Sequence, residues 1–449
     1  MIQSQSVAVS APGKVLLAGG YLVLDRKYTG LVFGLDARIH VCVSPVRTSP
    51  GVILSEIIVQ SPQFLDAIWE YGYRLSPGNG GMQVTELRAD ADLRLTRNLF
   101  IETALSYTLT YISTFQTHPL PSASITILAD NAYYSTPSSA GPLSRFHSFA
   151  CPLSAAHKTG LGSSAALVTA FTAALLRYYL PRESFSLDGD MGKRRLHNLA
   201  QAAHCAAQGK VGSGFDVASA VYGSCVYRRF SPDLLAGCGE IGTKGFATRL
   251  REVVDETGEG GPWDTEVVKG KVAVPKGLRL VMCDVKGGSQ TPGMVKKVLK
   301  WREAEGESAE EFWGRLQSAN EGLAKEMVKV ADEGSAEYGA LKSKLNEIRG
   351  LIREMSERSG VPIEPVEQTK LIDACSEVEG VIGGVVPGAG GYDAISLLIE
   401  DRQEVADKLA ELVKGWDFGG EGKVSVLPVR EEMEGVRSEQ ADGYRQWTD

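Results

Sequence analysis

The sequence predicts a mixed α/β protein made of two halves. Its 449 residues are many for a single core, so two domains are the natural expectation. Short runs with the alternating pattern of β-strands are interspersed with longer runs of helical periodicity. Near Phe230 the composition shifts, and residues 237–270 are rich in Gly, Glu and Thr. We therefore expect one domain over residues 1–230 and a second over residues 231–449.

In the first half, strand and helix patterns alternate around glycine-rich turns. Strands are expected at 7–10 and 31–43, flanking a glycine-rich turn at 18–21, and a helix at 98–115. A further strand is expected at 124–128, followed by a long apolar helix at 165–180 that Pro181 ends. A helix at 193–208 and a glycine turn at 209–216 lead into an apolar segment that runs to Val226.

In the second half, residues 237–270 resemble surface connections or a linker, and the rest follows a β-α-β-β-α-β order. Residues 292–359 are largely helical and charged. The strands are expected at 278–285, 381–386, 394–400 and 424–429, with a helix at 403–416. This order is the split pattern of a ferredoxin-like layer.

One apolar stripe in the helical region has two possible explanations. It consists of Phe312, Leu316, Leu323, Met327 and Val330, which recur at helical spacing. The stripe could be a dimer seam, but a helix face packed on its own domain is favoured. Monomer and homodimer both remain open.

Composition and charge exclude several classes of function. The net charge is −8 and the basic residues are scattered, so there is no electrostatic footprint for nucleic acid. No apolar run reaches the roughly 18–20 residues that span a bilayer, and the first residues lack a signal-peptide pattern. The seven cysteines are dispersed and form no C-x-x-C pair, which argues against disulfides and zinc. We expect a cytoplasmic protein without a nucleic-acid or membrane partner.

The stretch from His157 to Ala166 is the strongest functional signal. Gly160 and Gly162 allow a tight turn, and Ser163 and Ser164 stand where the apolar helix begins. A helix N-terminus offers free N–H donors and partial positive charge, so it suits an anion. An ordinary helix cap after a glycine turn is the alternative, and it is the less favoured one.

Two well-known nucleotide patterns fail their context tests. Residues 160–165 satisfy G-x-G-x-x-A, but the dinucleotide fold also needs an acidic residue about 20 positions on, where this chain has a polar loop. The pattern G-x-x-x-x-G-K-[ST] is absent, because Gly13-Lys14 and Gly209-Lys210 are both followed by Val. A nucleoside triphosphate would therefore need a different loop.

Three segments together resemble the GHMP small-molecule kinases. They are Pro12-Gly-Lys14 with Gly19-Gly-Tyr21, Lys158-Thr-Gly-Leu-Gly-Ser-Ser-Ala-Ala166, and Pro387-Gly-Ala-Gly-Gly-Tyr-Asp393. The resemblance runs from residue 7 to about residue 400. It implies a ribosomal-S5-like N-terminal domain, a ferredoxin-like C-terminal domain, and an active site in the cleft between them.

Within this family the likeness is closest to the members that phosphorylate 5-phosphomevalonate. Residues 10–14, 157–160 and 203–217 carry it. It implies ATP and Mg²⁺ as cofactors, 5-phosphomevalonate as the second substrate, and 5-diphosphomevalonate as the product in the isoprenoid pathway. Two alternatives stay open: another GHMP kinase such as mevalonate kinase, and a catalytically inactive metabolite sensor of the same fold.

The resemblance also implies roles for residues at the phosphate site. Lys14 would contact the substrate phosphate or the transferring group, Lys158 would neutralise phosphate charge, and Asp216 matches the catalytic aspartate. Ser164 would be the Mg²⁺ ligand. The ATP phosphates would lie on the turn and helix start formed by Gly160, Leu161, Gly162, Ser163, Ser164 and Ala165.

Other residues are expected to face the acceptor. Tyr21, Ser213 and Gly390 belong to the matching motifs, and Ser289 and Thr291 stand at a predicted helix start, where simple capping is equally plausible. One departure concerns the metal: several relatives place a Glu ligand about 11 residues before the catalytic Asp, whereas this chain has His204 and Cys205 there. Family precedent and the helix after Asn98 suggest an adenine pocket in the first domain.

Overall fold

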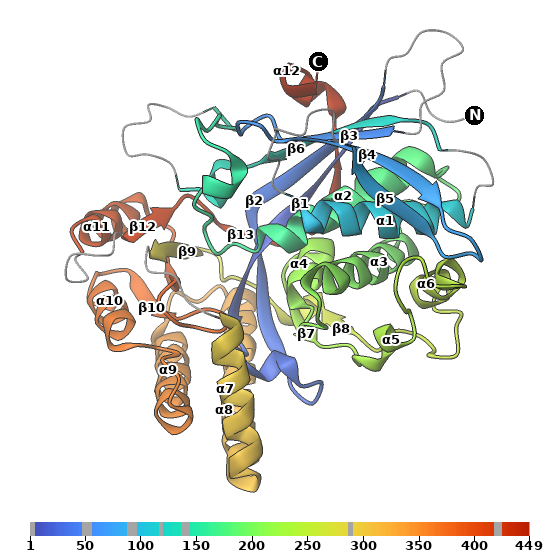
Figure 1. Ribbon diagram of the computed structural model, residues 1–449. Helices are drawn as coiled ribbons and strands as arrows, with labels where there is room; N and C mark the ends of the chain where they lie inside the picture. Colours follow the sequence, from blue (N-terminus) through green and yellow to red (C-terminus); the bar gives the residue numbers. More distant parts are fainter. Residues whose placement is uncertain are drawn as a thin grey trace.

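Two β-sheets organise the molecule, each with helices packed against it (Figure 1). The computed structural model describes residues 5–46, 56–87, 97–115, 120–135, 144–285, 291–416 and 424–448. Within these ranges no helix is both long enough and apolar enough to cross a membrane.

The larger sheet has the strand order β14-β1-β2-β6-β3-β4-β5. Strands β7 and β13 also pair with β2, and β8 pairs with β7. All of these pairs are antiparallel except β3 with β6. The strands are β1 (Val7–Ala18), β2 (Gly30–Pro45), β3 (Glu56–Gln60), β4 (Ile68–Leu75), β5 (Met82–Leu87), β6 (Ala123–Ala129), β7 (Cys225–Arg228), β8 (Glu266–Val268), β13 (Glu431–Glu432) and β14 (Arg437–Glu439).

A group of helices covers one face of this sheet (Figure 1). The central one, α2 (Ser163–Tyr179), is apolar nearly all round, so it lies buried between the sheet and its neighbours. The others are α1 (Leu99–Ser113), α3 (Asp190–Gln208), α4 (Phe215–Tyr222) and α6 (Phe246–Asp255), with the short α5 (Asp233–Ala236) nearby in the sequence. Pro181 follows α2, as predicted.

The smaller sheet has the order β10-β11-β9-β12 and is antiparallel throughout. Its strands are β9 (Leu278–Val285), β10 (Val381–Val385), β11 (Ala394–Glu400) and β12 (Val424–Leu427). The helices of this half are α7 (Thr291–Glu305), α8 (Glu307–Glu333), α9 (Gly339–Ser359), α10 (Val366–Ser376) and α11 (Gln403–Lys414). The predicted β-α-β-β-α-β order is confirmed, with α7 to α10 inserted in the first crossover.

The remaining short elements are one-turn helices. They are η1 (Leu22–Leu24), η2 (Asn131–Tyr133), η3 (Leu153–Ala155), η4 (Lys269–Lys271), η5 (Ala441–Tyr444) and α12 (Arg445–Thr448).

The structure corrects two expectations and confirms a third. Residues 237–270 are not only surface connections, because α6 buries Phe246, Leu250 and Val254. The strand expected at 7–10 extends to Ala18, so Pro12-Gly-Lys14 lies inside β1, whose register with β2 shifts between Pro12 and Gly13. The apolar stripe of α8 is buried within the single chain, so it packs on its own domain as favoured.

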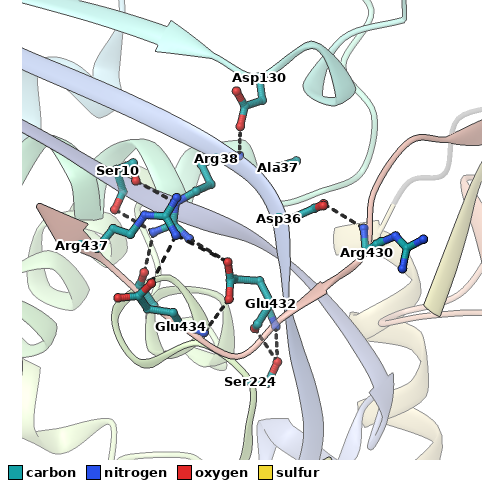
Figure 2. Close-up of polar contacts among 12 residues, drawn as sticks. Ser10, Asp36, Ala37, Arg38, Asp130, Ser224, Arg430, Glu432, Glu434 and Arg437 are labelled. Carbon is teal, nitrogen blue, oxygen red and sulfur yellow. Dashed lines mark hydrogen bonds and ion pairs between the residues drawn. The ribbon is translucent and has the colours of Figure 1, made fainter. Parts of the chain in front are cut away.

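The C-terminal segment returns to the first sheet and is held there by buried Arg38 (Figure 2). Arg38 Nε donates to Ser10 Oγ at 2.7 Å, and Nη2 donates to the Gly435 carbonyl at 2.5 Å. Ser10 Oγ donates in turn to Glu439 in β14 at 2.7 Å. Residues beyond the predicted boundary at 230 therefore complete the larger sheet.

Candidate active site

The glycine turn before α2 is joined directly to strand β1. The Lys14 backbone N–H donates to the Leu161 carbonyl at 2.9 Å. Gly162 has a φ of 81° and caps the start of α2, a conformation that favours glycine. A Cβ on Gly162 would stand 2.8 Å from Lys14 Cε. The turn and the Lys14 side chain thus lie in contact, next to the free N–H groups of the α2 N-terminus.

A cavity of about 580 Å³ lies between the two halves. Six of the predicted site residues line it: Lys14, Tyr21, Gly160, Ser213, Asp216 and Gly390. They come from β1, the turn after β1, the turns before α2 and α4, α4 itself, and the glycine segment between β10 and β11. Segments that are far apart in the sequence are therefore brought to one wall.

Lys14 is the central cation of this cavity. Its Nζ donates to the Gly160 carbonyl at 3.4 Å and stands 5.6 Å from the centre of the Phe215 ring. Burial lowers the pKa of the Lys14 ammonium, and the negative charge of Asp216 opposes that shift. Lys14 and Asp216 are therefore electrostatically coupled.

Asp216 serves the helix and the cavity together. Its Oδ1 accepts from the Val217 N–H in the first turn of α4, at 3.0 Å. Its Oδ2 faces His204 Nε2 at 3.9 Å. The hydrogen bond to α4 therefore still leaves Asp216 at the cavity wall, where the catalytic role is expected.

His204 stands near the position where several relatives are expected to have a Glu metal ligand. Its Nε2 is 3.1 Å from Ser164 Oγ and 3.3 Å from Gln208 Nε2. An imidazole with its proton on Nδ1 accepts a hydrogen bond from the Ser164 hydroxyl, which leaves the lone pairs of Ser164 Oγ free. Neighbouring Cys205 is buried, and burial raises the pKa of its thiol. The hydrogen bond between His204 and Ser164 therefore orients the Ser164 hydroxyl.

The two halves touch at the floor of the cavity. The Tyr21 hydroxyl donates to the Ala389 carbonyl at 2.7 Å, and the Gly388 N–H donates to the Leu16 carbonyl at 3.1 Å. A Cβ on Gly20 would stand 2.2 Å from the Gly388 oxygen, so the backbones approach as closely as glycine allows. Tyr21 lines the cavity, but its hydroxyl proton is already used across the interface.

Some predicted residues are not at the cavity wall, and residues 161–165 of the turn and helix start are among them. Lys158 is exposed and is not among the residues lining the cavity. Ser289 lies outside the described residues, and Thr291 is described only as the first residue of α7.

Two cations at the cavity were missed by sequence reasoning. They are Lys210 and Arg229. Lys210 lies within the glycine segment 209–216, so its place beside a predicted turn could have indicated it. Arg229 follows a short strand without any local motif, and only the fold brings it to the site.

A second cavity of about 850 Å³ adjoins the first and shares Cys205, Lys210 and Val211 with it. Leu99, Ser106 and Tyr107 of α1 line one side of it. It lies in the first half, beside the helix after Asn98 that suggested an adenine pocket.

Comparisons with known proteins show the family to which the chain belongs. The model of the family "GHMP kinases N terminal domain" matches residues 151–224. A phosphomevalonate kinase of Gibberella zeae is 54% identical over 99% of both chains, and one of Aspergillus fumigatus is 48% identical over 98% of both. A relative from Arabidopsis thaliana, described as a peroxisomal phosphomevalonate kinase, is 34% identical over 97% of both.

Among solved structures, phosphomevalonate kinase of Streptococcus pneumoniae in complex with phosphomevalonate and AMPPNP is similar. It covers 95% of this chain and 100% of its own, with a TM-score of 0.61 and 16% identity. The two-sheet fold is that of a GHMP kinase. By its full-length likeness to the fungal relatives, the chain belongs to the phosphomevalonate kinases of that family.

Proposed function

We propose that this chain transfers the γ-phosphoryl group of ATP to the phosphate of 5-phosphomevalonate, forming 5-diphosphomevalonate and ADP. The observation that carries the proposal is the meeting of Lys14, Asp216 and Gly160 of the turn before α2 at one cavity between the halves. Phosphoryl transfer depends mainly on positioning and on stabilising negative charge. This cavity supplies both.

The nucleotide phosphates are placed on the turn before α2. Gly160, Leu161 and Gly162 form the turn, while Ser163, Ser164 and Ala165 supply the first N–H groups of the helix. The adenine is placed in the adjoining cavity beside Tyr107. Lys158, exposed before the turn, is proposed to contact the outer phosphates from the rim.

The acceptor is already ionised, which changes what Asp216 has to do. A phosphate monoester has a second pKa near about 6, so at neutral pH most of it is a dianion. One of its oxygens attacks the γ-phosphorus, a P–O–P bond forms, and the bond to the β-phosphate oxygen breaks as ADP leaves. No proton has to be removed first. Repulsion between two phosphates is the larger obstacle, and Lys14 counters it.

The oxygen groups near His204 fit Mg²⁺. Ser164 Oγ and Asp216 Oδ2 both lie within 4 Å of one nitrogen, and Mg²⁺ in such sites is held by one or two protein oxygens together with substrate phosphates and water. Within the described ranges no group of three or more His, Cys, Asp or Glu could hold a metal alone. When bound, Mg²⁺ would neutralise phosphate charge. Ser164 is the proposed ligand.

The acceptor is placed on the opposite side of Lys14, against Tyr21, Ser213 and Gly390. Gly390 has a φ of 72°, and a Cβ there would stand 2.2 Å from the Ile363 oxygen, so its backbone must remain close-packed. Ser289 and Thr291 stay proposed contacts of the acceptor phosphate.

Release of ADP from the purified chain tests the proposal. Phosphomevalonate, mevalonate and galactose are offered side by side with ATP and Mg²⁺. Turnover with phosphomevalonate alone supports the assignment, and preference for mevalonate or galactose would reassign the acceptor. Absence of turnover with all three would favour an inactive sensor.

We also propose a cytoplasmic location. A fluorescent fusion of the full chain, imaged beside a peroxisomal marker, distinguishes the cytoplasm from the compartment named for the Arabidopsis relative.

A further inference from the structure

Lys14 is not the only cationic side chain at the cavity between the halves. Among the described residues that line it, the cations are Lys14, Lys210 and Arg229, and the carboxylates are Asp216 and Asp393. Lys14 is electrostatically coupled to Asp216 and contacts Gly160 in the turn before α2. Arg229 needs a separate explanation, because it lies on other segments of the wall.

Two backbone carbonyls hold the Arg229 guanidinium in place. Nη1 donates to the Leu24 carbonyl at 2.6 Å, and Nη2 donates to the Val211 carbonyl at 3.1 Å. Both of these residues also line the cavity. The guanidinium is therefore fixed before any ligand arrives. It has five N–H donors, and these two bonds leave three of them over.

Among the described residues, the charge of Arg229 has no carboxylate partner. In the part of the chain that the structure describes, no carboxylate oxygen lies within 4.0 Å of it, and its buried Nε has no hydrogen-bond partner. Asp25, which influences it electrostatically, is paired with Arg302 at 2.6 Å. Burial lowers the pKa of the Arg229 guanidinium. A fixed, half-buried cation with only neutral partners is suited to an anionic ligand.

The neighbouring segments indicate which substrate that is. Leu24 ends the one-turn helix that follows Tyr21, and Val211 stands two residues before Ser213. Both segments carry residues assigned above to the acceptor. The ATP phosphates, by contrast, are assigned to the turn at 160–162 and the start of α2.

We propose that Arg229 binds an anionic oxygen group of the acceptor, its carboxylate or its phosphate, and so selects a doubly anionic acceptor. This rests on the proposed function. The planar pairs of N–H groups on a guanidinium match the paired oxygens of both a carboxylate and a phosphate. Arg229 and Lys14 would then hold the acceptor at two points, which fixes the attacking oxygen relative to the γ-phosphate.

Kinetics of full-length Arg229→Gln test the proposal, with Arg228→Gln as the matched control. Arg228 pairs with Glu266 at 3.0 Å and is not among the residues lining the cavity. A lost charged hydrogen bond corresponds to a rise of about tenfold or more in the KM for 5-phosphomevalonate. The KM for ATP should stay within about twofold, and the Arg228→Gln enzyme should resemble the wild type in both.

Arg229→Lys keeps the positive charge but loses the planar pairs of N–H donors, so it should raise the KM for 5-phosphomevalonate by a smaller factor. This variant decides the matter if Arg229→Gln does not fold. An unchanged KM for the acceptor, or equal rises for both substrates, would overturn the proposal. If the wild-type enzyme itself does not use 5-phosphomevalonate, it is the proposed function that fails.

Calorimetric binding of two further probes identifies the group. Mevalonate carries only the carboxylate, and the analogue of 5-phosphomevalonate with its carboxylate reduced to an alcohol carries only the phosphate. The probe whose affinity falls in Arg229→Gln carries the group that Arg229 binds. Unchanged affinity for both probes would contradict any contact of Arg229 with the acceptor.

Discussion

At the scale of single residues, Lys14 and Asp216 have different parts in the proposed phosphoryl transfer. Lys14 contacts Gly160 in the turn before α2. One oxygen of Asp216 accepts from the first turn of α4, and the other faces His204. With an acceptor that is already ionised, charge neutralisation outweighs proton removal. Lys14 should therefore matter more than Asp216.

Comparing Asp216→Asn with Lys14→Met tests this order. Removing a general base typically costs about 10²–10⁴ in rate. We expect a smaller fall in kcat for Asp216→Asn, and a larger fall for Lys14→Met. Steady-state kinetics at saturating substrates give both values. A greater loss for Asp216→Asn would show that the aspartate acts as an obligatory base.

The pH dependence offers a second residue-scale prediction. Lys14 must be protonated to neutralise phosphate, and burial holds its pKa below the usual value of about 10.4. The rate kcat/KM should therefore fall on the alkaline side as Lys14 loses its proton. Asp216 raises that pKa, so Asp216→Asn should move the alkaline fall to lower pH. A fall that stays in place or moves upward would contradict the coupling.

At the scale of elements, the contact between the C-terminal segment and β2 completes the larger sheet. Buried Arg38 connects Ser10 of β1 with Gly435, beside β14 (Figure 2). Breaking a buried charged contact leaves its partners unsatisfied in a low dielectric. The stability of the sheet should therefore depend on this one side chain.

Arg38→Met is expected to lower the free energy of unfolding by about 3 kcal/mol. Arg445→Ala is the control, because the Arg445–Asp442 pair is exposed and such pairs contribute at most about 1 kcal/mol. Urea denaturation of both variants provides the comparison. Equal effects of the two substitutions would mean that Arg38 does not hold the segment.

Which elements the sequence predicts follows from how local their signals are. The helix α2 and the strands β9, β11 and β12 have continuous apolar patterns, so their positions could be predicted closely. No strand was predicted from the sequence at the positions of β3, β4 and β5. Exposed Ile68 and Leu75, with Gly72 between them, blur the inside–outside alternation of β4. The two- and three-residue strands β13 and β14 exist only through their partners.

The candidate site divides in the same way. Motif residues such as Lys14 and Asp216 could be predicted to meet, since the family resemblance assigns both to the same phosphate site. Arg229 could not, because its position depends on how β7 pairs with β2. The hydrogen bond of Tyr21 to Ala389 depends on how the two halves meet, which no local pattern encodes.

At the scale of the whole molecule, the two halves are interleaved. Helix α6 packs on α1 and α3, and β8, β13 and β14 extend the larger sheet, although all of them follow residue 230. Arg302 of α7 binds Asp25 at 2.6 Å, which adds a charged contact between the halves. The cleft is thus bounded by elements that fold together.

A fragment of residues 1–230 should therefore fail to fold as a monomer. It would expose the surface that Phe246, Leu250 and Val254 cover and the β2 edge that β13 pairs with. Circular dichroism and size-exclusion chromatography measure this. Fusing residues 231–273 and 429–449 to the fragment should improve folding, and a well-folded 1–230 fragment would show that the later elements are dispensable.

The central claim is that the accepting atom belongs to a phosphate. Phosphorus NMR of the reaction of the purified chain with ATP, Mg²⁺ and 5-phosphomevalonate measures this directly. We expect the monoester resonance to disappear and two mutually coupled resonances of a diphosphate ester to replace it as ADP accumulates. A monoester resonance that persists unchanged while ADP accumulates would contradict the claim.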